Sequence, residues 1–184
     1  MRSDPSSDVT ANIAVENAGP VDAVVVMGVA GCGKTSVGLA LAGILGWPFL
    51  EGDSFHPAEN IAKMSAGIPL QDEDRWGWLD IIAARIAQAR ESGESVVVSC
   101  SALKRRYRER LAAGGLRVLF VHLSGTRELI HSRMALRTGH YMPTSLLDSQ
   151  FAALEPLAAD EFGITCDIDA SPAEIAARVA PLAS

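Results

Sequence analysis

The chain lacks any long apolar run. Across its 184 residues no stretch approaches the roughly 18 apolar residues that a membrane-spanning helix needs. The first 20 residues carry Ser, Asp, Asn and Pro and contain no apolar region of the signal-peptide type. We therefore expect a flexible N-terminal tail over residues 1–20, followed by a single domain over residues 21–184.

Cysteine and positive charge are also scarce. The three cysteines, Cys32, Cys100 and Cys166, show no paired spacing, which argues against a zinc site and favours reduced thiols in a cytoplasmic protein. The 16 Lys and Arg residues are outnumbered by 22 Asp and Glu residues, and the net charge is −6. Because nucleic-acid binding depends on clustered positive charge, a broad nucleic-acid-binding surface is not expected.

What the chain does contain is a phosphate-binding loop of the form G-x-x-x-x-G-K-[ST]. The motif comprises Gly28, Val29, Ala30, Gly31, Cys32, Gly33, Lys34 and Thr35, and Ser36 follows it. A short apolar run at residues 23–27 precedes the motif and predicts a buried strand. An apolar stripe after the motif predicts a helix and is formed by Val37, Leu41, Ile44 and Leu45. The motif therefore lies between a strand and a helix, as this type of loop requires.

This loop predicts binding of a nucleoside triphosphate. Glycines let backbone N–H groups curl around phosphate oxygens, and the N-terminus of the following helix adds partial positive charge. Lys34 is expected to reach the β- and γ-phosphates, and the Thr35 hydroxyl to hold Mg²⁺. The alternative is a glycine-rich turn that matches the motif by chance. Such a match is expected in about one per cent of chains of this length.

Strand and helix signals alternate along the rest of the chain. Apolar and β-branched runs predict strands at residues 23–27, 47–51, 95–100, 118–123 and 164–168. Helical patterns separate these strands, and Asp72 or Asp74 is expected to cap the longest helix. The alternation predicts a three-layer α/β fold, with a central parallel sheet of about five strands and helices on both faces.

Polar clusters follow the predicted strands, at the edge where open α/β sheets bind their ligands. Asp53 comes just after the second strand and is placed to accept a proton from an acceptor hydroxyl; alternatively, it only caps the next helix. Asn60 and Lys63 share a helix face, and Trp76 and Trp78 beside charged residues indicate a lined pocket.

A basic helix follows the third predicted strand, at residues 101–110. Its first residues are suited to bind an anionic substrate, whereas Arg106, Arg108 and Arg110 are expected to stay on the surface. Nucleic-acid binding by this helix is the alternative, and it would depend on these basic residues alone.

Two further arginines, Arg133 and Arg137, share one face of a later predicted helix. A short Gly-Pro segment, residues 139–143, comes next and has a composition suited to folding over a nucleotide. One arginine plane can stack on adenine while the other bridges phosphates. The alternative is an ordinary charged helix face followed by a turn.

Together these stretches resemble the gluconate kinases, small P-loop kinases related in fold to shikimate and adenylate kinases. The matching stretches are residues 28–35, Glu51-Gly52-Asp53 with His56-Pro57, Asn60-x-x-Lys63-Met64 through Asp74-Arg75, Cys100 through Arg108, Arg137-x-Gly139-His140-Tyr141-Met142-Pro143, and Leu147-x-Ser149-Gln150-Phe151-x-x-Leu154-Glu155. The likeness runs from about residue 22 onward and covers the rest of the chain.

The resemblance implies ATP-dependent phosphorylation of D-gluconate at its terminal hydroxyl, which gives 6-phosphogluconate. It makes Lys34 and Asp53 the catalytic residues, with Asp53 as the base that orients the hydroxyl. The residues implied to surround the sugar acid are Asp53, His56, Lys63, Arg75, Lys104 and His140. The resemblance assigns Arg133 and Arg137 to the nucleotide. It also implies a substrate-binding segment at about residues 55–80, a lid at about residues 138–144 and a possible homodimer.

No predicted strand ends in the Asp that many P-loop proteins use as a second magnesium-binding residue. We therefore expect Mg²⁺ to depend on Thr35, the phosphates and water, with Asp53 nearby. Other functions remain open from the sequence. They are a kinase for another small polyhydroxy acid such as shikimate, a kinase for a nucleoside monophosphate, and a nucleotide-dependent switch without transfer activity.

Overall fold

The computed structural model describes residues 20–136, 143 and 145–184. Within these residues five strands form one parallel sheet in the order β2-β3-β1-β4-β5. The strands are β1 (Ala23–Met27), β2 (Phe49–Glu51), β3 (Val96–Ser99), β4 (Val118–Ser124) and β5 (Gly163–Asp167). The α-helices are α1 (Lys34–Leu45), α2 (Ala58–Ser65), α3 (Asp72–Glu91), α4 (Arg105–Leu111), α5 (Arg127–Ala135), α6 (Ser145–Ala153) and α7 (Pro172–Ala183). Two short 3₁₀ helices, η1 (Gly52–Phe55) and η2 (Ala113–Gly115), complete the set.

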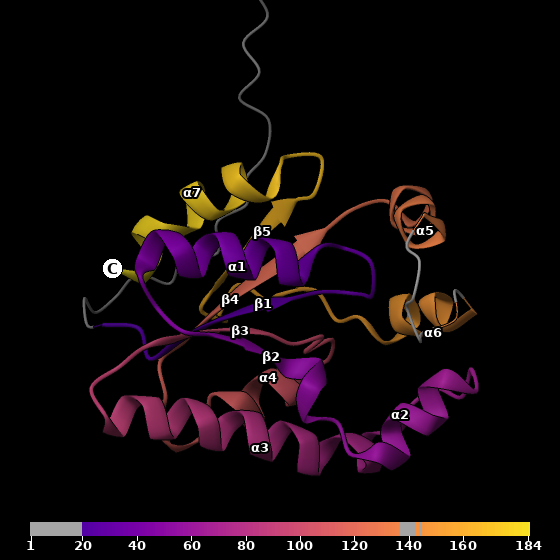
Figure 1. The fold of residues 1–184 in the computed structure, drawn as a ribbon, viewed down its shortest axis with the longest axis horizontal. Helices are drawn as coiled ribbons and strands as arrows, with labels where there is room; N and C mark the ends of the chain where they lie inside the picture. The colour runs from indigo at the N-terminus through magenta and orange to yellow at the C-terminus, as the bar shows by residue number, and fades with distance from the viewer. Residues whose placement is uncertain (1–19, 137–142, 144) are drawn as a thin grey trace, which may run out of the picture.

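The elements form three layers (Figure 1). Helices α1 and α7 cover one face of the sheet, and α3 and α4 cover the other. Helices α2, α5 and α6 lie beyond one end of the sheet. The predicted three-layer α/β fold with about five parallel strands is therefore confirmed. The predicted tail and lid fall outside the described residues, apart from Pro20 and Pro143.

The middle of the sheet is apolar on both faces. Strand β1 is fully buried, and its Val25 pairs with Val98 of β3 and with Phe120 of β4. This burial explains the unbroken apolar runs in the sequence, because a parallel strand covered by helices on both sides has no solvent-facing positions. The phosphate-loop motif therefore follows the central, fully buried strand of the sheet.

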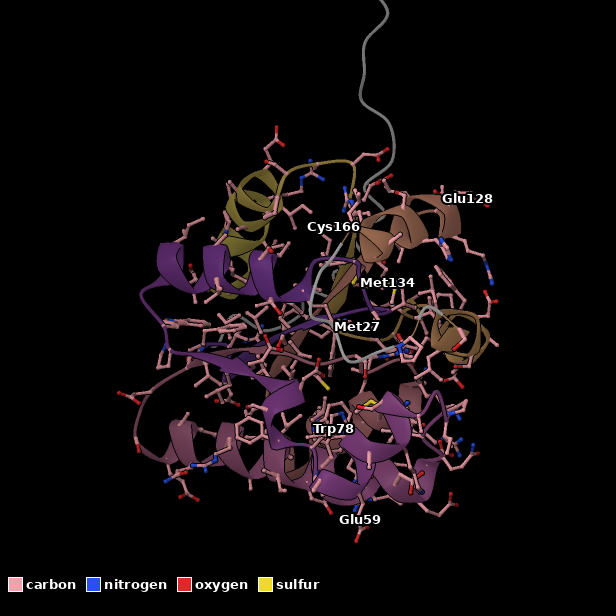
Figure 2. All side chains as sticks on the ribbon, turned by 45° about the vertical axis from the view of Figure 1, so that its right-hand side comes forward. Met27, Glu59, Trp78, Glu128, Met134 and Cys166 are labelled. Atoms are coloured by element: carbon pink, nitrogen blue, oxygen red, sulfur yellow. The ribbon has the colours of Figure 1, made fainter. Side chains whose placement is uncertain are left out.

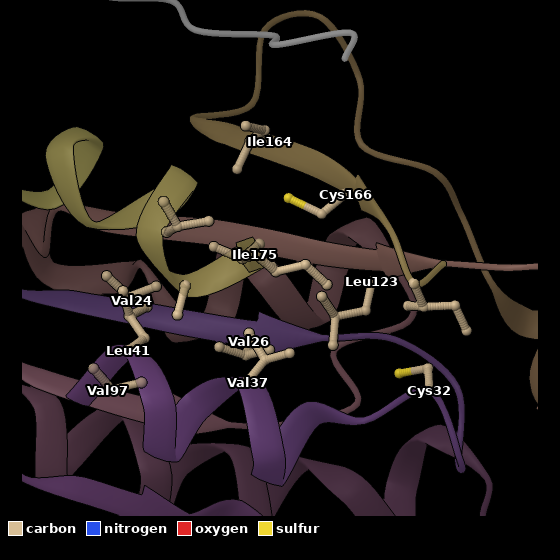
Figure 3. Packing of buried hydrophobic residues seen from close by; sticks show 14 of the residues in the cluster. Val24, Val26, Cys32, Val37, Leu41, Val97, Leu123, Ile164, Cys166 and Ile175 are labelled. Carbon is tan, nitrogen blue, oxygen red and sulfur yellow. The ribbon is translucent and has the colours of Figure 1, made fainter. Parts of the chain in front are cut away.

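Alternate residues of β1 point to opposite faces of the sheet and pack into the two halves of the core. Val24 and Val26 pack on the α1 and α7 side, with Leu41 of α1 and Ile175 of α7 (Figure 3). On the other side lies Trp78 of α3, together with other buried side chains of that helix (Figure 2). Each large apolar side chain buried in this way stabilises the fold by about 1.5–3 kcal/mol.

Two sequence predictions about helices are wrong. Ile44 was expected in the buried stripe of α1, but its side chain is 54% exposed, because the helix faces the sheet with Val37 and Leu41 instead. Neither Asp72 nor Asp74 is the N-cap of α3. Gln71 holds that position, and the Asp74 carboxylate accepts its backbone N–H at 2.9 Å.

The three cysteines are buried free thiols. In the part of the chain that the structure describes, every helix is too short or too polar to cross a membrane.

The sheet order brings distant segments of the chain to one edge. The phosphate loop follows β1, η1 follows β2, and residues 100–104 follow β3. These three strands are neighbours in a parallel sheet, so all three segments lie at their common carboxyl ends. The Gly28 N–H donates to the Ser101 carbonyl at 3.2 Å and ties two of the segments together.

Candidate active site

The phosphate loop has the backbone form that the motif predicts. Gly28, Gly31 and Gly33 all adopt positive φ angles, of 143°, 80° and 100°. At Gly28 a Cβ atom would also lie 2.9 Å from the Leu123 carbonyl oxygen, so only glycine fits. Helix α1 begins directly after the loop, at Lys34, and its N-terminus is directed at the loop.

The two polar side chains of the motif are held by neighbours. The Lys34 ammonium donates to the Val29 carbonyl at 3.0 Å. The Thr35 hydroxyl donates to the Glu51 carboxylate at 2.6 Å, and the Ser99 hydroxyl donates to the other oxygen of the same carboxylate. Glu51 thus joins the ends of β2 and β3 to the start of α1. Glu51 has no predicted role, although its position at the end of β2 is a signal for one.

Asp53 lies in η1, directly after β2, and its position is set by Gly52. A Cβ atom at Gly52 would lie 2.0 Å from the Ser99 carbonyl oxygen, so no larger residue fits. The Gly52 N–H donates to the Ser99 hydroxyl at 3.2 Å, and the Trp78 indole donates to the Gly52 carbonyl at 2.8 Å. The prediction that Trp76 and Trp78 line the substrate pocket is wrong, because neither side chain lines the cavities described below. Trp78 is buried and supports the segment that carries Asp53.

We call the cavity beside the loop the phosphate-loop cavity. It brings together eight predicted site residues, which are Ala30, Gly31, Gly33, Lys34, Thr35, Asp53, His56 and Arg75. Glu51, Ser101 and Gln150 also contribute to its walls. A neighbouring cavity, here the Lys104 cavity, includes Lys104 with Leu103 and Tyr107. Arg75, Met64 and Gln150 line both cavities and form the boundary between them.

The predicted substrate cations differ in their partners. Lys63 pairs with Asp74 at 2.6 Å, and Lys104 pairs with Asp72 at 3.0 Å. Arg75 lines both cavities and makes no salt bridge within the described residues. Of these three cations, Arg75 is therefore the one that has no carboxylate partner among the described residues.

His56 is a buried, neutral histidine. Its ring stacks on Trp78, with centroids 4.0 Å apart and planes inclined by 16°, and the Asn60 amide lies 3.3 Å from its Nδ1. Burial, together with the positive charge of Arg75, lowers the pKa of His56 from 6.5 to about 4. At neutral pH the ring can therefore form hydrogen bonds but carries no charge.

This low pKa makes stability depend on pH. The unfolded chain binds a proton at His56 near pH 6.5, whereas the folded chain resists protonation until about pH 4, so stability should fall as the pH decreases between these values. For one such group the loss is about 2 kcal/mol at pH 5. His122 adds a similar contribution, because burial and, to a smaller extent, the charge of Arg108 lower the pKa of His122 to about 4.

Urea unfolding from pH 7 to pH 5 measures this effect. His56→Phe keeps an aromatic ring against Trp78 and should remove roughly half of the acid loss, because His122 still contributes. His131→Gln changes an exposed histidine of α5 and should leave the pH dependence unaltered. An unchanged acid loss in His56→Phe would contradict the assignment.

A larger cavity of about 520 Å³ lies on the other side of the phosphate loop. It is lined by Gly31 and Ser36 of the loop region, by Arg133 of α5 and by the segment between β5 and α7. Arg133 donates to the Ile168 carbonyl at 2.9 Å, which fixes its guanidinium at this cavity. Arg137 and His140 lie outside the described residues, so their predicted roles remain predictions.

The described residues contain no cluster of three or more His, Cys, Asp or Glu side chains that is suited to a metal ion. Thr35 and Glu51 nevertheless offer oxygen atoms at the entrance to the loop, as Mg²⁺ prefers. A metal that keeps several waters and binds substrate phosphates needs only one or two such protein groups.

The prediction for Arg108 is wrong. Arg106 and Arg110 lie at the surface, but the side chain of Arg108 is only 1% exposed and pairs with Glu161 at 2.6 Å. Its guanidinium also donates to the carbonyls of Ala102 and Leu103, at 3.1 and 3.2 Å. Arg108 therefore holds the turn that carries Ser101 and Lys104 to the two cavities. Ala102 in this turn has a φ of 42°, the one positive value at a non-glycine among the described residues.

Fold and site together define a small P-loop kinase: a glycine loop for a triphosphate, with a carboxylate and an arginine in the same cavity. A family model described as shikimate kinase matches residues 30–180. A probable gluconokinase of Rattus norvegicus is 44% identical, over 85% of this chain and 94% of the rat protein. The chain belongs to the gluconokinase family.

Solved structures agree with this placement. A sugar kinase from Janibacter sp. HTCC2649 is 48% identical with a TM-score of 0.83, over 87% of this chain and 92% of that protein. A gluconokinase from Sinorhizobium meliloti 1021 is 48% identical with a TM-score of 0.76, over 89% of this chain and 95% of that protein. The family resemblance found in the sequence is thus confirmed.

Proposed function

We propose that the protein transfers the γ-phosphoryl group of ATP to the terminal hydroxyl of D-gluconate and produces 6-phospho-D-gluconate. One observation carries this proposal: Asp53 and Arg75 line the same cavity as Lys34 of the phosphate loop. A base for a hydroxyl and a cation for a carboxylate therefore lie beside the site for the triphosphate. The names of the relatives, which include gluconokinases, support the choice of acceptor.

In this proposal the loop holds the donor and Asp53 orients the acceptor. The acceptor oxygen forms a bond to the γ-phosphorus while the bond from that phosphorus to the β–γ bridging oxygen breaks, and ADP leaves. The hydroxyl proton passes to the Asp53 carboxylate. Lys34 exchanges its contact with the Val29 carbonyl for the β- and γ-phosphates and stabilises their charge.

The residues present fit a magnesium ion. Thr35 and Glu51 would hold it, directly or through water, with the phosphates completing the shell. When bound, Mg²⁺ neutralises charge on the β- and γ-phosphate oxygens. The Ser99 hydroxyl fixes the orientation of the Glu51 carboxylate, so this protein group is oriented before the nucleotide arrives.

In this proposal gluconate lies across the boundary between the phosphate-loop cavity and the Lys104 cavity. Arg75 would bind its carboxylate, because a guanidinium matches that group with two parallel hydrogen bonds. Neutral His56 is suited to a sugar hydroxyl. Lys63 and Lys104 remain predicted contacts, and each would have to share its charge with Asp74 or Asp72.

The nucleotide base would occupy the cavity beside Arg133, whose volume of about 520 Å³ suits a planar base and its ribose. The guanidinium of Arg133 supplies a flat cationic surface for stacking. We infer a cytoplasmic location from the free thiols and from the use of ATP.

A substrate panel tests the function. The purified chain, with ATP and Mg²⁺, is assayed for ADP release on D-gluconate, other sugar acids, shikimate and AMP, and the phosphorylated product is identified by mass spectrometry. We expect D-gluconate to give the highest kcat/KM. Lys34→Met controls for contaminating kinases, since it removes the phosphate-binding ammonium. Activity on shikimate or AMP without activity on gluconate would refute the proposal.

A further inference from the structure

The side chain of Gln150 joins two parts of the site that are far apart in the sequence. Gln150 belongs to α6 and is buried, with 9% of its surface exposed. Its Oε1 accepts the backbone N–H of Ala30, inside the phosphate loop, at 2.6 Å. The contact spans 120 positions of the chain and ties α6 to the loop.

The same side chain lies at the boundary between the two cavities. It lines the phosphate-loop cavity together with Lys34 and Asp53, and the Lys104 cavity together with Lys104. An acceptor held by Arg75 in the proposed site would therefore share the walls of both cavities with the Gln150 side chain. A carboxamide suits this place, because it both donates and accepts hydrogen bonds and adds no negative charge near a triphosphate.

Helix α6 also contacts the predicted substrate-binding segment. Its Leu146 forms a small apolar cluster with Met64 of α2 and Leu70, which precedes α3. Gln150 lies one turn further along the same helix and faces the phosphate loop. Helix α6 thus connects the segment that would bind the acceptor to the loop that would bind the donor.

We propose that Gln150 is a positioning residue that fixes the phosphate loop against α6 and keeps water out of the boundary between the two cavities. This inference rests on the proposed function, which supplies the acceptor. It assigns Gln150 a role in directing the phosphoryl group to the acceptor hydroxyl instead of to water. Loss of the hydrogen bond leaves the Ala30 N–H without this acceptor, and loss of the side-chain volume opens the boundary to solvent.

Two variants separate these contributions. Gln150→Leu keeps most of the volume but cannot accept from Ala30, and it should lower kcat about ten-fold with little change in the KM for ATP. Gln150→Ala also opens the boundary, and it should raise ADP release in the absence of acceptor several-fold. Asp148→Asn is the matched control, since Asp148 is an exposed residue of the same helix that pairs with Arg127. Thermal unfolding of each variant checks that it is folded.

The outcomes are distinct. If both Gln150 variants keep kcat within about two-fold of the parent and ADP release without acceptor is unchanged, the inference is overturned. If the parent chain does not phosphorylate gluconate, the proposed function fails. In that case ADP release without acceptor from Gln150→Ala still decides the role of Gln150, because this measurement needs no acceptor.

Discussion

Asp53→Asn is expected to lower kcat for gluconate phosphorylation by about 10²–10⁴-fold, the range typical for loss of a positioned base. Asparagine keeps the size of the side chain but cannot accept the hydroxyl proton. The affinity for ATP should stay near that of the parent, because the proposed nucleotide contacts come from the phosphate loop and α1. Steady-state kinetics with both substrates, together with calorimetric titration of a non-hydrolysable ATP analogue, measures the two effects separately.

Glu59→Gln is a matched control for this experiment. Glu59 is an exposed carboxylate of α2, six positions from Asp53, and its side chain lies at the periphery of the molecule (Figure 2). Its neutralisation should leave kcat unchanged, whereas a general effect of the net charge of the protein would lower kcat in both variants. A kcat for Asp53→Asn within a few-fold of the parent would exclude Asp53 as the base. A parent chain that binds ATP without any turnover would instead favour the nucleotide-dependent switch.

Arg108→Met is expected to destabilise the protein by about 3–5 kcal/mol, the cost of removing one partner of a buried ion pair. Methionine fills much of the space but leaves the Glu161 carboxylate, 10% exposed, without its partner. It also removes the donor to the Ala102 and Leu103 carbonyls. Urea unfolding at pH 7 gives the change in the free energy of unfolding.

Two further variants test the cause of this loss. Arg110→Met removes an exposed arginine of the same helix, which pairs with a half-exposed Asp80, and should cost less than about 1 kcal/mol. Arg108→Met combined with Glu161→Gln should recover part of the stability, because the uncompensated buried charge is then gone. If Arg108→Met alone lowers the free energy of unfolding by less than about 1 kcal/mol, the buried ion pair is not the cause of the expected loss.

The fold was predictable because its signals are local. The runs around Val25 and Val98 are apolar since both faces of these strands are covered, and such runs are visible in the sequence without any tertiary information. The same logic placed Asp53 beside the phosphate loop, because residues that follow parallel strands meet at one edge of the sheet.

Other features depend on partners far along the chain. The burial of Arg108 requires Glu161, 53 positions away, and the surrounding sequence is as charged as an exposed helix face. The hydrogen bond from Ala30 to Gln150 has no local signal either. Residue type alone did not show that Lys104 is already paired with an aspartate, because the pairing follows from the packing of α4 on α3.

The small apolar cluster of Met64, Leu70 and Leu146 has a consequence for motion. It anchors α2 with far fewer buried side chains than hold the central strands, so the free energy of local opening should be lower around α2 than around β1. The amide hydrogens of α2 should therefore exchange with solvent through small openings, while those of β1 exchange only when the whole domain unfolds. The segment proposed to select the acceptor can thus rearrange without loosening the loop proposed to hold the triphosphate.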